Sequence, residues 1–293
     1  MLGSRRTASD AGEVNAIYNR LRVVALTIMV GALPFLCYAE DGSRNRYLDD
    51  YNKPVGFTYG ANATLNTMYL WRGIYAGGLN IQGGANVGYG GLYADLWWNI
   101  GTTDWSFTRF QPEMDITLGF ARWGLDVNVL FVHNFNCPFF DFGNRPQGGN
   151  ALELRLQYTV SSKLPLTFLW STRVAGSDWY LSATGDTTRA YSTYVELSYM
   201  QPLPFGLSAG GAVGITPWKS FYTEYQGAFA VQNVEVRVRK DWSLSERCGL
   251  KLLGALSINP TALANDRTTA QWHPTHPSKQ SINVNLAVGV YLK

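Results

Sequence analysis

Ionisable side chains recur at every second position in several segments of this chain. Glu153 and Arg155 alternate with leucines, and Glu235, Arg237 and Arg239 alternate with valines. A period of two places the charges on one face of a β-strand and the apolar residues on the other. Acids and bases gathered on one face could bind polar solutes, or they could pair with one another.

Further ionisable residues occupy the same phase of neighbouring segments, with acids and bases in similar numbers. The candidate lumen-lining residues are Arg72, Asp95, Glu113, Asp115, Asp126, Glu153, Arg155, Arg173, Glu196, Glu235, Arg237, Arg239 and Lys251. The sequence holds no phosphate-binding loop, dinucleotide fingerprint or paired-cysteine metal motif, so we expect no cofactor.

The elements that must position these charges are strands, because apolar residues alternate with polar or glycine residues from Phe57 to Lys293. Turn residues divide this region into twelve segments. We predict strands at 56–72, 80–89, 92–100, 110–121, 125–134, 150–159, 165–174, 190–200, 207–215, 228–240, 250–259 and 281–292. Strands with one apolar and one charged face suit a barrel in a membrane. The sequence therefore predicts an all-β protein, a closed antiparallel transmembrane β-barrel of about twelve strands.

The predicted connections alternate between short and long. Gly90-Gly91 and Arg122–Gly124 are short, whereas Phe135–Gly149 and Pro260–Gln280 are long. Outer-membrane barrels alternate short periplasmic turns with longer external loops in this way. We expect that Phe135–Gly149 could fold inward and constrict the lumen. Cys137 and Cys248 should then lie at opposite ends of the barrel, too far apart for a disulfide.

Aromatic residues near the predicted strand ends indicate belts at the two membrane interfaces. The belt candidates are Trp71, Trp98, Trp123, Trp170, Trp242 and Tyr291. The alternative is a packed core, as in other tryptophan-rich β proteins, but the chain has 10 Trp and 17 Tyr, which is many for such a core. Charged residues make up 15% of the chain, against roughly 25% in soluble domains.

The amino-terminal region predicts an export signal. Val23–Cys37 is mostly apolar, follows Arg20 and Arg22, and is short for a membrane-spanning helix. With cleavage after Ala39, residues 1–39 form an N-terminal extension and signal peptide, 40–54 a polar periplasmic tether and 55–293 the barrel. The region after the signal holds no second long apolar run, so a bundle of membrane helices is not expected.

Three histidines could do chemistry of their own. His133 falls on the apolar phase of its strand near the outer rim, where it could act as the base of a lipid-acting hydrolase, as in some twelve-stranded barrels. Phe135 stands where a hydroxyl would be wanted, so we expect a histidine bonded to lipid headgroups and keep the hydrolase as the alternative. His273 and His276, with Asp266, are a weak metal pattern in a predicted loop, where a solvated loop is the simpler interpretation.

The opening hairpins resemble a known family. Tyr69-Leu70-Trp71-Arg72-Gly73-Ile74, then Gln82-Gly83-Gly84 and Gly91-Leu92-Tyr93-Ala94, are similar to the TorF-like family of Gram-negative outer-membrane proteins. Glu113-Met114-Asp115-Ile116 resembles the strand that follows in that family. The resemblance covers about residues 57–135 and implies a fold and a location rather than an activity. The terminal Lys293 departs from the aromatic residue with which bacterial barrels usually end.

Together these features predict an outer-membrane protein of a Gram-negative bacterium. Its lumen would form a narrow channel for small polar solutes or a barrel closed by its own salt bridges, and a twelve-stranded barrel lies between filled and open sizes. The expected partners are outer-membrane lipid, lipopolysaccharide and the barrel assembly machinery. A net charge of +3 without a basic cluster excludes nucleic acid as an expected partner.

Overall fold

The computed structural model describes residues 56–102, 110–135, 137–143, 149–182, 184–227, 229–261 and 282–292. The predicted signal peptide (1–39), the tether (40–54), the loop histidines His273 and His276 and the terminal Lys293 lie outside the described residues. Within the described ranges, none of the helices is long and apolar enough to cross a bilayer.

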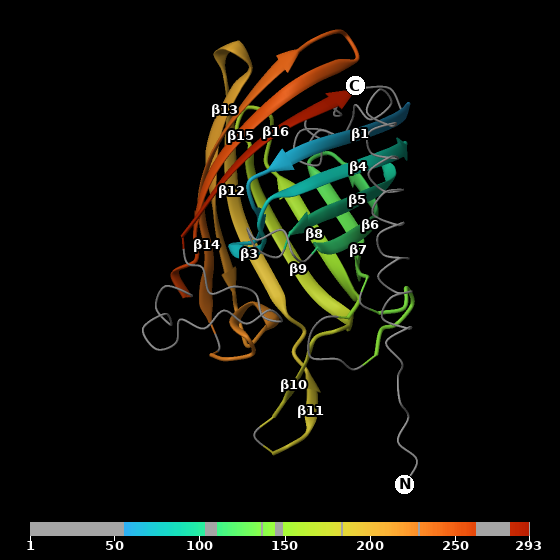
Figure 1. Ribbon diagram of the computed structural model, residues 1–293, viewed down its shortest axis with the longest axis vertical. Helices are drawn as coiled ribbons and strands as arrows, with labels where there is room; N and C mark the ends of the chain where they lie inside the picture. The colour runs from blue at the N-terminus through green and yellow to red at the C-terminus, as the bar shows by residue number, and fades with distance from the viewer. Residues whose placement is uncertain are drawn as a thin grey trace, which may run out of the picture.

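Twelve antiparallel strands form one closed barrel, which confirms the predicted fold class (Figure 1). The barrel strands are β1 (Phe57–Asn66), β4 (Asn80–Tyr89), β5 (Leu92–Thr102), β6 (Phe110–Arg122), β7 (Leu125–Asn134), β8 (Ala151–Thr159), β9 (Leu166–Gly176), β12 (Thr193–Leu203), β13 (Leu207–Thr216), β14 (Ala230–Ser243), β15 (Cys248–Ile258) and β16 (Ile282–Leu292). β1 closes the sheet by pairing with β4 on one side and with β16 on the other. Closure leaves the barrel without an edge strand.

The two faces of the barrel wall differ in polarity, as the alternating strands β8 and β14 show. On β8, Leu154 is 50% exposed on the exterior, whereas the preceding Glu153 is fully buried on the other face. On β14, Val236 is 59% exposed and lies between Glu235 and Arg237. Large apolar side chains therefore cover the exterior, and ionisable ones face the interior, which is the reverse of a soluble protein.

Three of the five short connections are tight turns that end in glycine, two of them with two residues and the third with three. Gly90-Gly91, Trp123-Gly124 and Phe205-Gly206 each place two successive residues at positive φ. Two-residue hairpin turns need this left-handed backbone, which matches the twist of the flanking strands and favours glycine at the second position. These turns lie at the same end of the barrel as the carboxyl terminus (Figure 1). The described parts of the connections after β7, β9 and β13 lie at the opposite end.

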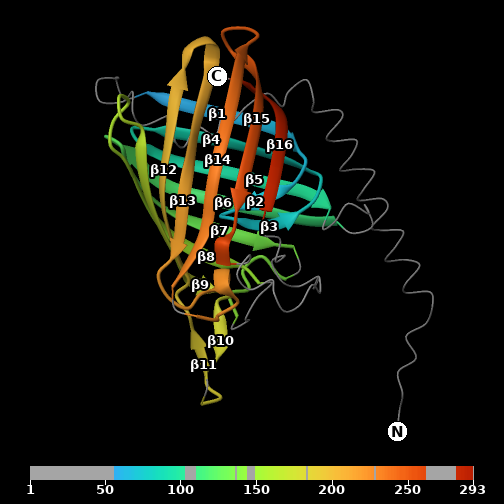
Figure 2. The same cartoon turned by 90° about the vertical axis from the view of Figure 1, so that its left-hand side faces the viewer.

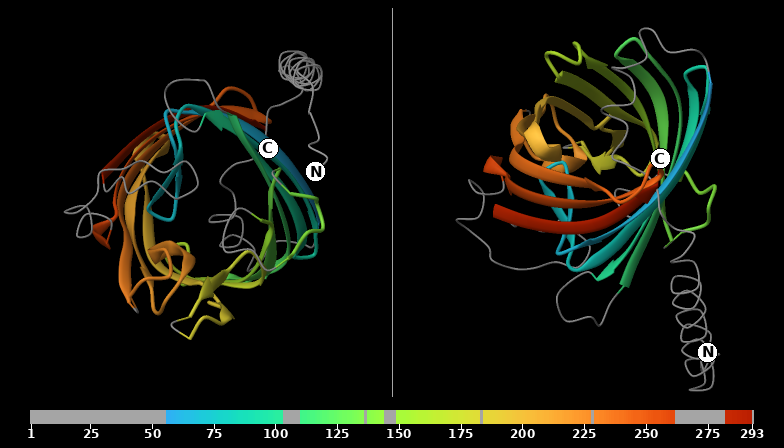
Figure 3. Two further views of the ribbon diagram at one scale, coloured as in Figure 1. Left: turned by 60° about the horizontal axis from the view of Figure 1, so that its bottom comes forward. Right: turned by 90° about the horizontal axis from the view of Figure 1, so that it is seen from above.

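Two small hairpins interrupt the longer connections, and both depart from the predicted boundaries. The predicted strand 56–72 ends at Asn66, and the chain continues as a separate hairpin of β2 (Tyr69–Trp71) and β3 (Ile74–Gly77). The predicted loop after β9 contains β10 (Trp179–Leu181) and β11 (Thr187–Arg189). The β10–β11 hairpin extends beyond the long-connection end (Figure 2). The β2–β3 hairpin instead lies inside the ring of strands (Figure 3).

Only part of the predicted belt set lies on the exterior of the barrel. Trp123, Trp170 and Trp242 are exposed on the wall or at its short-turn end, with exposed fractions of 41–49%. Trp71 belongs to the internal hairpin, and Tyr291 is buried against Gly249 on the interior face. Both belt predictions are wrong: Trp71 leaves the wall because the first strand ends at Asn66, and Tyr291 has the interior phase of Asn283 and Asn285 on β16.

The remaining elements complete the fold. The 3-10 turn η2 (Pro204–Gly206) joins β12 to β13, and η3 (Phe221–Thr223) lies in the connection between β13 and β14. Cys137 lies in the connection after β7 and Cys248 begins β15 at the short-turn end, and both are free thiols, as the strand count predicts.

Candidate functional site

The β2–β3 hairpin is the element that enters the lumen, and its turn repeats the pattern of the short connections. Arg72 and Gly73 have φ values of 52° and 78°, so they form the same kind of left-handed turn as Trp123-Gly124. A Cβ atom on Gly73 would lie 2.1 Å from the backbone carbonyl oxygen of Gln232 on β14. Glycine is therefore required both by the turn and by the contact of its tip with the barrel wall.

Arg72 holds the tip of the hairpin through a buried network of charges. Its guanidinium lies 2.9 Å from the Glu153 carboxylate on β8 and donates a 3.0 Å hydrogen bond to the Ser171 hydroxyl on β9. Arg173 of β9 lies 3.2 Å from the other oxygen of the same carboxylate. Ser171 in turn donates to Glu153 over 2.7 Å. Glu153 is fully buried, so these partners offset the cost of removing its charge from water.

Aromatic rings enclose both guanidinium groups. The Arg72 guanidinium carbon lies 4.7 Å from the centre of the Trp71 ring, and that of Arg173 lies 4.2 Å from the Phe221 ring. Trp71 and Tyr222 have ring centres 5.5 Å apart, and Arg72 also donates to the Tyr222 hydroxyl. Burial raises the pKa of Tyr222, in η3, to about 12, so this hydroxyl stays protonated near neutral pH. The rings exclude water and strengthen the ion pairs.

The base of the hairpin contacts a different part of the wall. Tyr69 donates to the Glu113 carboxylate on β6 over 3.1 Å, and its ring centre lies 5.5 Å from that of Trp97 on β5. The backbone carbonyl of Gly73, at the other end, accepts a 3.3 Å hydrogen bond from the Asn259 amide, just after β15. The hairpin thus reaches β5–β6, β8–β9 and β14–β15 at once and forms a cross-member in the lumen (Figure 3).

The charges on the barrel wall itself are distributed unevenly. In the closed ring of twelve strands, β6 lies six places from β14, and β7 lies six places from β15. The two pairs of strands are therefore on opposite sides of the barrel. The interior phase of β5–β7 carries four acids of the predicted set, Asp95, Glu113, Asp115 and Asp126. On β14, Arg237 pairs with Glu235 and the Arg239 Nε atom lies 2.6 Å from an Asp241 oxygen, so each of these bases has an acid two residues away.

The other predicted residues have separate surroundings. Arg155 donates to Asn128 over 2.6 Å and to Thr117 over 3.1 Å, and Glu196 accepts a 2.8 Å hydrogen bond from the Tyr194 hydroxyl. Lys251 lies on the interior phase of β15. Of the predicted set, the structure thus brings together Arg72, Glu153 and Arg173, with Glu113 at the other end of the same hairpin. Arg72 reaches them from the hairpin turn and not from a barrel strand.

Sequence reasoning missed the hairpin and the aromatic residues around it. Trp71 was expected in a belt, and Tyr69, Tyr194 and Tyr222 were not assigned to the interior. The usable signal was the dipeptide Arg72-Gly73, because an X-Gly pair between apolar residues predicts a tight hairpin turn. The pairing of Glu153 with two arginines had no local signal, because the three residues come from three different elements.

His133, the candidate base of a hydrolase, is covered. It is 5% exposed, its ring centre lies 4.6 Å from that of Phe135 and 5.0 Å from that of Phe139, and its Nδ1 atom lies 2.8 Å from the Asn150 amide oxygen. It is therefore not the headgroup-facing histidine that was expected. No hydroxyl of the described residues hydrogen-bonds to it, and the Cys137 thiol lies 3.2 Å from the same Asn150 oxygen.

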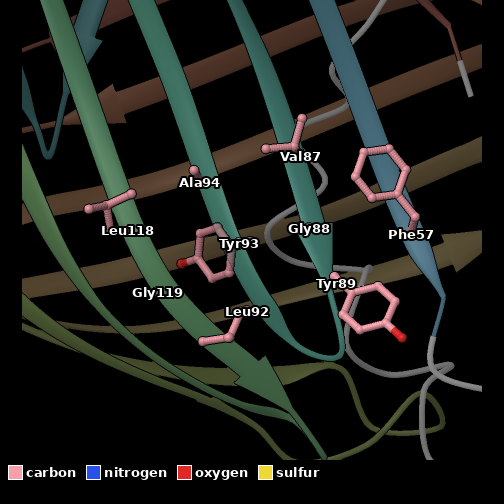
Figure 4. Close-up of a pocket in the computed structure, with 9 residues that line it drawn as sticks. All are labelled: Phe57, Val87, Gly88, Tyr89, Leu92, Tyr93, Ala94, Leu118 and Gly119. Atoms are coloured by element: carbon pink, nitrogen blue, oxygen red, sulfur yellow. The ribbon is translucent and has the colours of Figure 1, made fainter.

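A groove on the exterior wall offers no second chemical site. Phe57, Val87, Tyr89, Leu92 and Leu118 line it from β1, β4, β5 and β6 near the short-turn end (Figure 4). This lining is aliphatic and aromatic, as expected for a wall that faces acyl chains near an interface. Among the described residues there is also no group of three or more His, Cys, Asp or Glu that could hold a metal ion.

A closed twelve-stranded barrel with an apolar exterior and an ionisable interior is a β-barrel of the outer-membrane kind. No protein-family model and no curated protein matches the chain. Among solved structures, the chain is similar to the outer membrane phospholipase A from Escherichia coli. That comparison has a TM-score of 0.36 and 12% sequence identity, and it covers 84% of this chain and 98% of the other.

Proposed function

We propose that this chain is an outer-membrane channel for small polar solutes, with the β2–β3 hairpin as the constriction of its lumen. The observation that carries the proposal is the hairpin that crosses the lumen. A buried ion pair between Arg72 and Glu153 anchors this hairpin to the wall, whose interior face otherwise presents ionisable side chains. A hydrophilic interior narrowed by one inserted element is suited to pass small solutes and to exclude large ones.

Two buried oxygen atoms support a hydrated lumen. Asp115 Oδ1 and Gln232 Oε1 have no hydrogen-bond partner among the described residues, and they come from strands on opposite sides of the barrel. A buried amide or carboxylate oxygen without a protein partner requires water. The interior therefore favours water beside the hairpin over a fully packed plug.

The test is the conductance of the folded protein in planar bilayers, with and without the hairpin. Asn66 and Asn80 are paired neighbours, so replacing residues 67–79 with Asn-Gly can join β1 to β4 by a two-residue turn. We expect small conductance steps from the natural chain and clearly larger steps from the shortened one.

The matched control shortens the external hairpin instead. Leu181 and Thr187 are also paired, so Asn-Gly can replace residues 182–186, and this variant should conduct like the natural chain. Folding of each protein is checked by the difference in gel mobility between unheated and boiled samples. Equal steps with and without the β2–β3 hairpin would remove it as the constriction, and the absence of steps from folded samples would favour a closed structural barrel.

The alternative, a lipid-acting hydrolase with a rim histidine, is tested with the folded protein in phospholipid vesicles. Release of fatty acid or headgroup by the natural chain, and its loss in His133→Ala, would support that alternative over the channel. We also propose the outer membrane of a Gram-negative bacterium as the location, with outer-membrane lipid and lipopolysaccharide against the exterior and the barrel assembly machinery as the insertion partner. Membership of the TorF-like family stays a prediction.

A further inference from the structure

The connection after β7 folds outward over the barrel wall, not inward. We call its described residues, Phe135 and Cys137–Gly143, the strap. The ring centre of Phe139 lies 5.0 Å from that of Phe131, and Phe142 lies 5.5 Å from the same ring. Phe131 has the phase of the exposed Val127 and Val129 on β7. The strap therefore lies on the exterior, and the expectation that this loop constricts the lumen is wrong for its described part.

Asn150 satisfies two backbone carbonyls of the strap. Its amide nitrogen donates to the carbonyl oxygen atoms of Pro138 and Phe139 over 2.9 and 2.6 Å. Because both amide hydrogens point at the strap, the Asn150 oxygen faces His133, which must carry its proton on Nδ1 to donate to it. Asn150 is fully buried. Its side chain hydrogen-bonds to two strap carbonyls and to the His133 ring.

A chain segment can move from water into lipid only if its backbone N–H and C=O groups have hydrogen-bond partners within the protein. Irregular backbone is costly in lipid because an unpaired polar group there finds no water to hydrogen-bond to. Phe140 is 82% exposed and Phe135 is 55% exposed, although the Phe135 ring also packs against His133. The apolar surface of the strap is continuous with the exterior face of β7 and β8, which carries Val129 and Leu154.

We propose that the strap is immersed in the bilayer and that Phe135 and Phe140 contact the acyl chains of the outer leaflet. Asn150 is the positioning residue, since it fixes the strap against the wall. This proposal rests on the placement of the barrel in a lipid bilayer, and it adds a lipid-contacting surface to a connection that the strand pattern alone would place in the external water.

The test places an environment-sensitive nitrobenzoxadiazole label at one cysteine at a time, in a background with Cys37→Ser, Cys137→Ser and Cys248→Ser. The labelled variants are Phe140→Cys in the strap, Leu154→Cys on the exterior wall and Thr184→Cys between β10 and β11. The folded proteins are reconstituted into phosphatidylcholine vesicles that contain doxyl-labelled lipid as the quencher. We expect the label at position 140 to lose as much fluorescence as the label at 154, and the label at 184 to be unaffected.

A second variant tests the positioning role of Asn150. Asn150→Leu keeps the branching at Cγ but cannot hydrogen-bond to the strap, so quenching at position 140 should fall while that at 154 persists. If 154 is quenched and 140 behaves like 184, the strap lies in water and the proposal is wrong. If 154 is not quenched either, the placement in a bilayer fails, and with it the proposed channel.

Discussion

Glu153 is the residue on which the internal hairpin depends. It is fully buried, it accepts from Ser171, and its two oxygen atoms lie 2.9 Å from Arg72 and 3.2 Å from Arg173. Removing one partner of a buried ion pair is more costly than the pair is worth, because the remaining charge loses its compensation. Arg173 would still partner Glu153 if Arg72 were lost, which limits that cost.

Substituting Arg72→Met should lower the free energy of unfolding by about 1–3 kcal/mol, less than the full loss of a buried partner because Arg173 remains. The matched control is Arg239→Met, whose pair with Asp241 is 17–22% exposed and should contribute below about 1 kcal/mol. Both are measured by urea unfolding in detergent micelles with tryptophan fluorescence. Equal losses would show that the hairpin network contributes no more than a solvated pair.

The tip of the hairpin offers a second test. Gly73→Ala strains a left-handed position and places its Cβ against the Gln232 carbonyl. Gly185→Ala has a similar φ of +87° with nothing within 4 Å. Both should lose about 1 kcal/mol from strain, and Gly73→Ala about 1–3 kcal/mol more from overpacking. Urea unfolding measures the difference, and a difference near zero would contradict the docked tip.

At the scale of the strand, the interior charges of β14 form ion pairs within that strand, whereas the predicted interior charges of β5–β7 are all acids. The pairs Arg237–Glu235 and Arg239–Asp241 lie within one strand, two residues apart on its interior phase. Asp126 on β7 instead accepts from the neutral Tyr93 and Asn128, and Arg155 of β8 reaches this network only through Asn128. The acidic side of the lumen should therefore favour cations.

We expect Asp126→Asn to shift the reversal potential in a salt gradient toward anions, because the amide keeps the shape and an acceptor oxygen but removes the charge. Asp186→Asn makes the same change at the exposed end of the β10–β11 hairpin and should leave the potential unchanged. An equal shift in both variants would indicate a surface-charge effect, and no shift in either would remove the acidic wall as a determinant of selectivity.

At the scale of the whole molecule, the inverted polarity of the wall decides where the protein can be stable. Leu154 faces outward from β8, and Gln157 lies on its interior phase. In a bilayer, Leu154→Lys should cost about 2–4 kcal/mol near the midplane, while Gln157→Lys should cost far less. Unfolding in lipid vesicles measures both losses. The opposite order would mean that the apolar face does not meet lipid.

The sequence by itself determined the barrel. The period of two along β8, β14 and β16 and the alternation of short and long connections predict twelve strands with a charged interior, because each is a local property of the chain. The X-Gly signal at Arg72-Gly73 was equally local and could have divided the first predicted strand at its hairpin.

Only the tertiary structure decided what occupies the lumen and what covers the exterior rim. Arg72, Glu153 and Arg173 meet across three elements, and the strap turns outward because Asn150 meets its carbonyls there. Alternation assigns a residue to a face of its own strand, but it carries no information on which distant side chain shares that space. The direction of a connection depends on partners that come together only when the barrel closes.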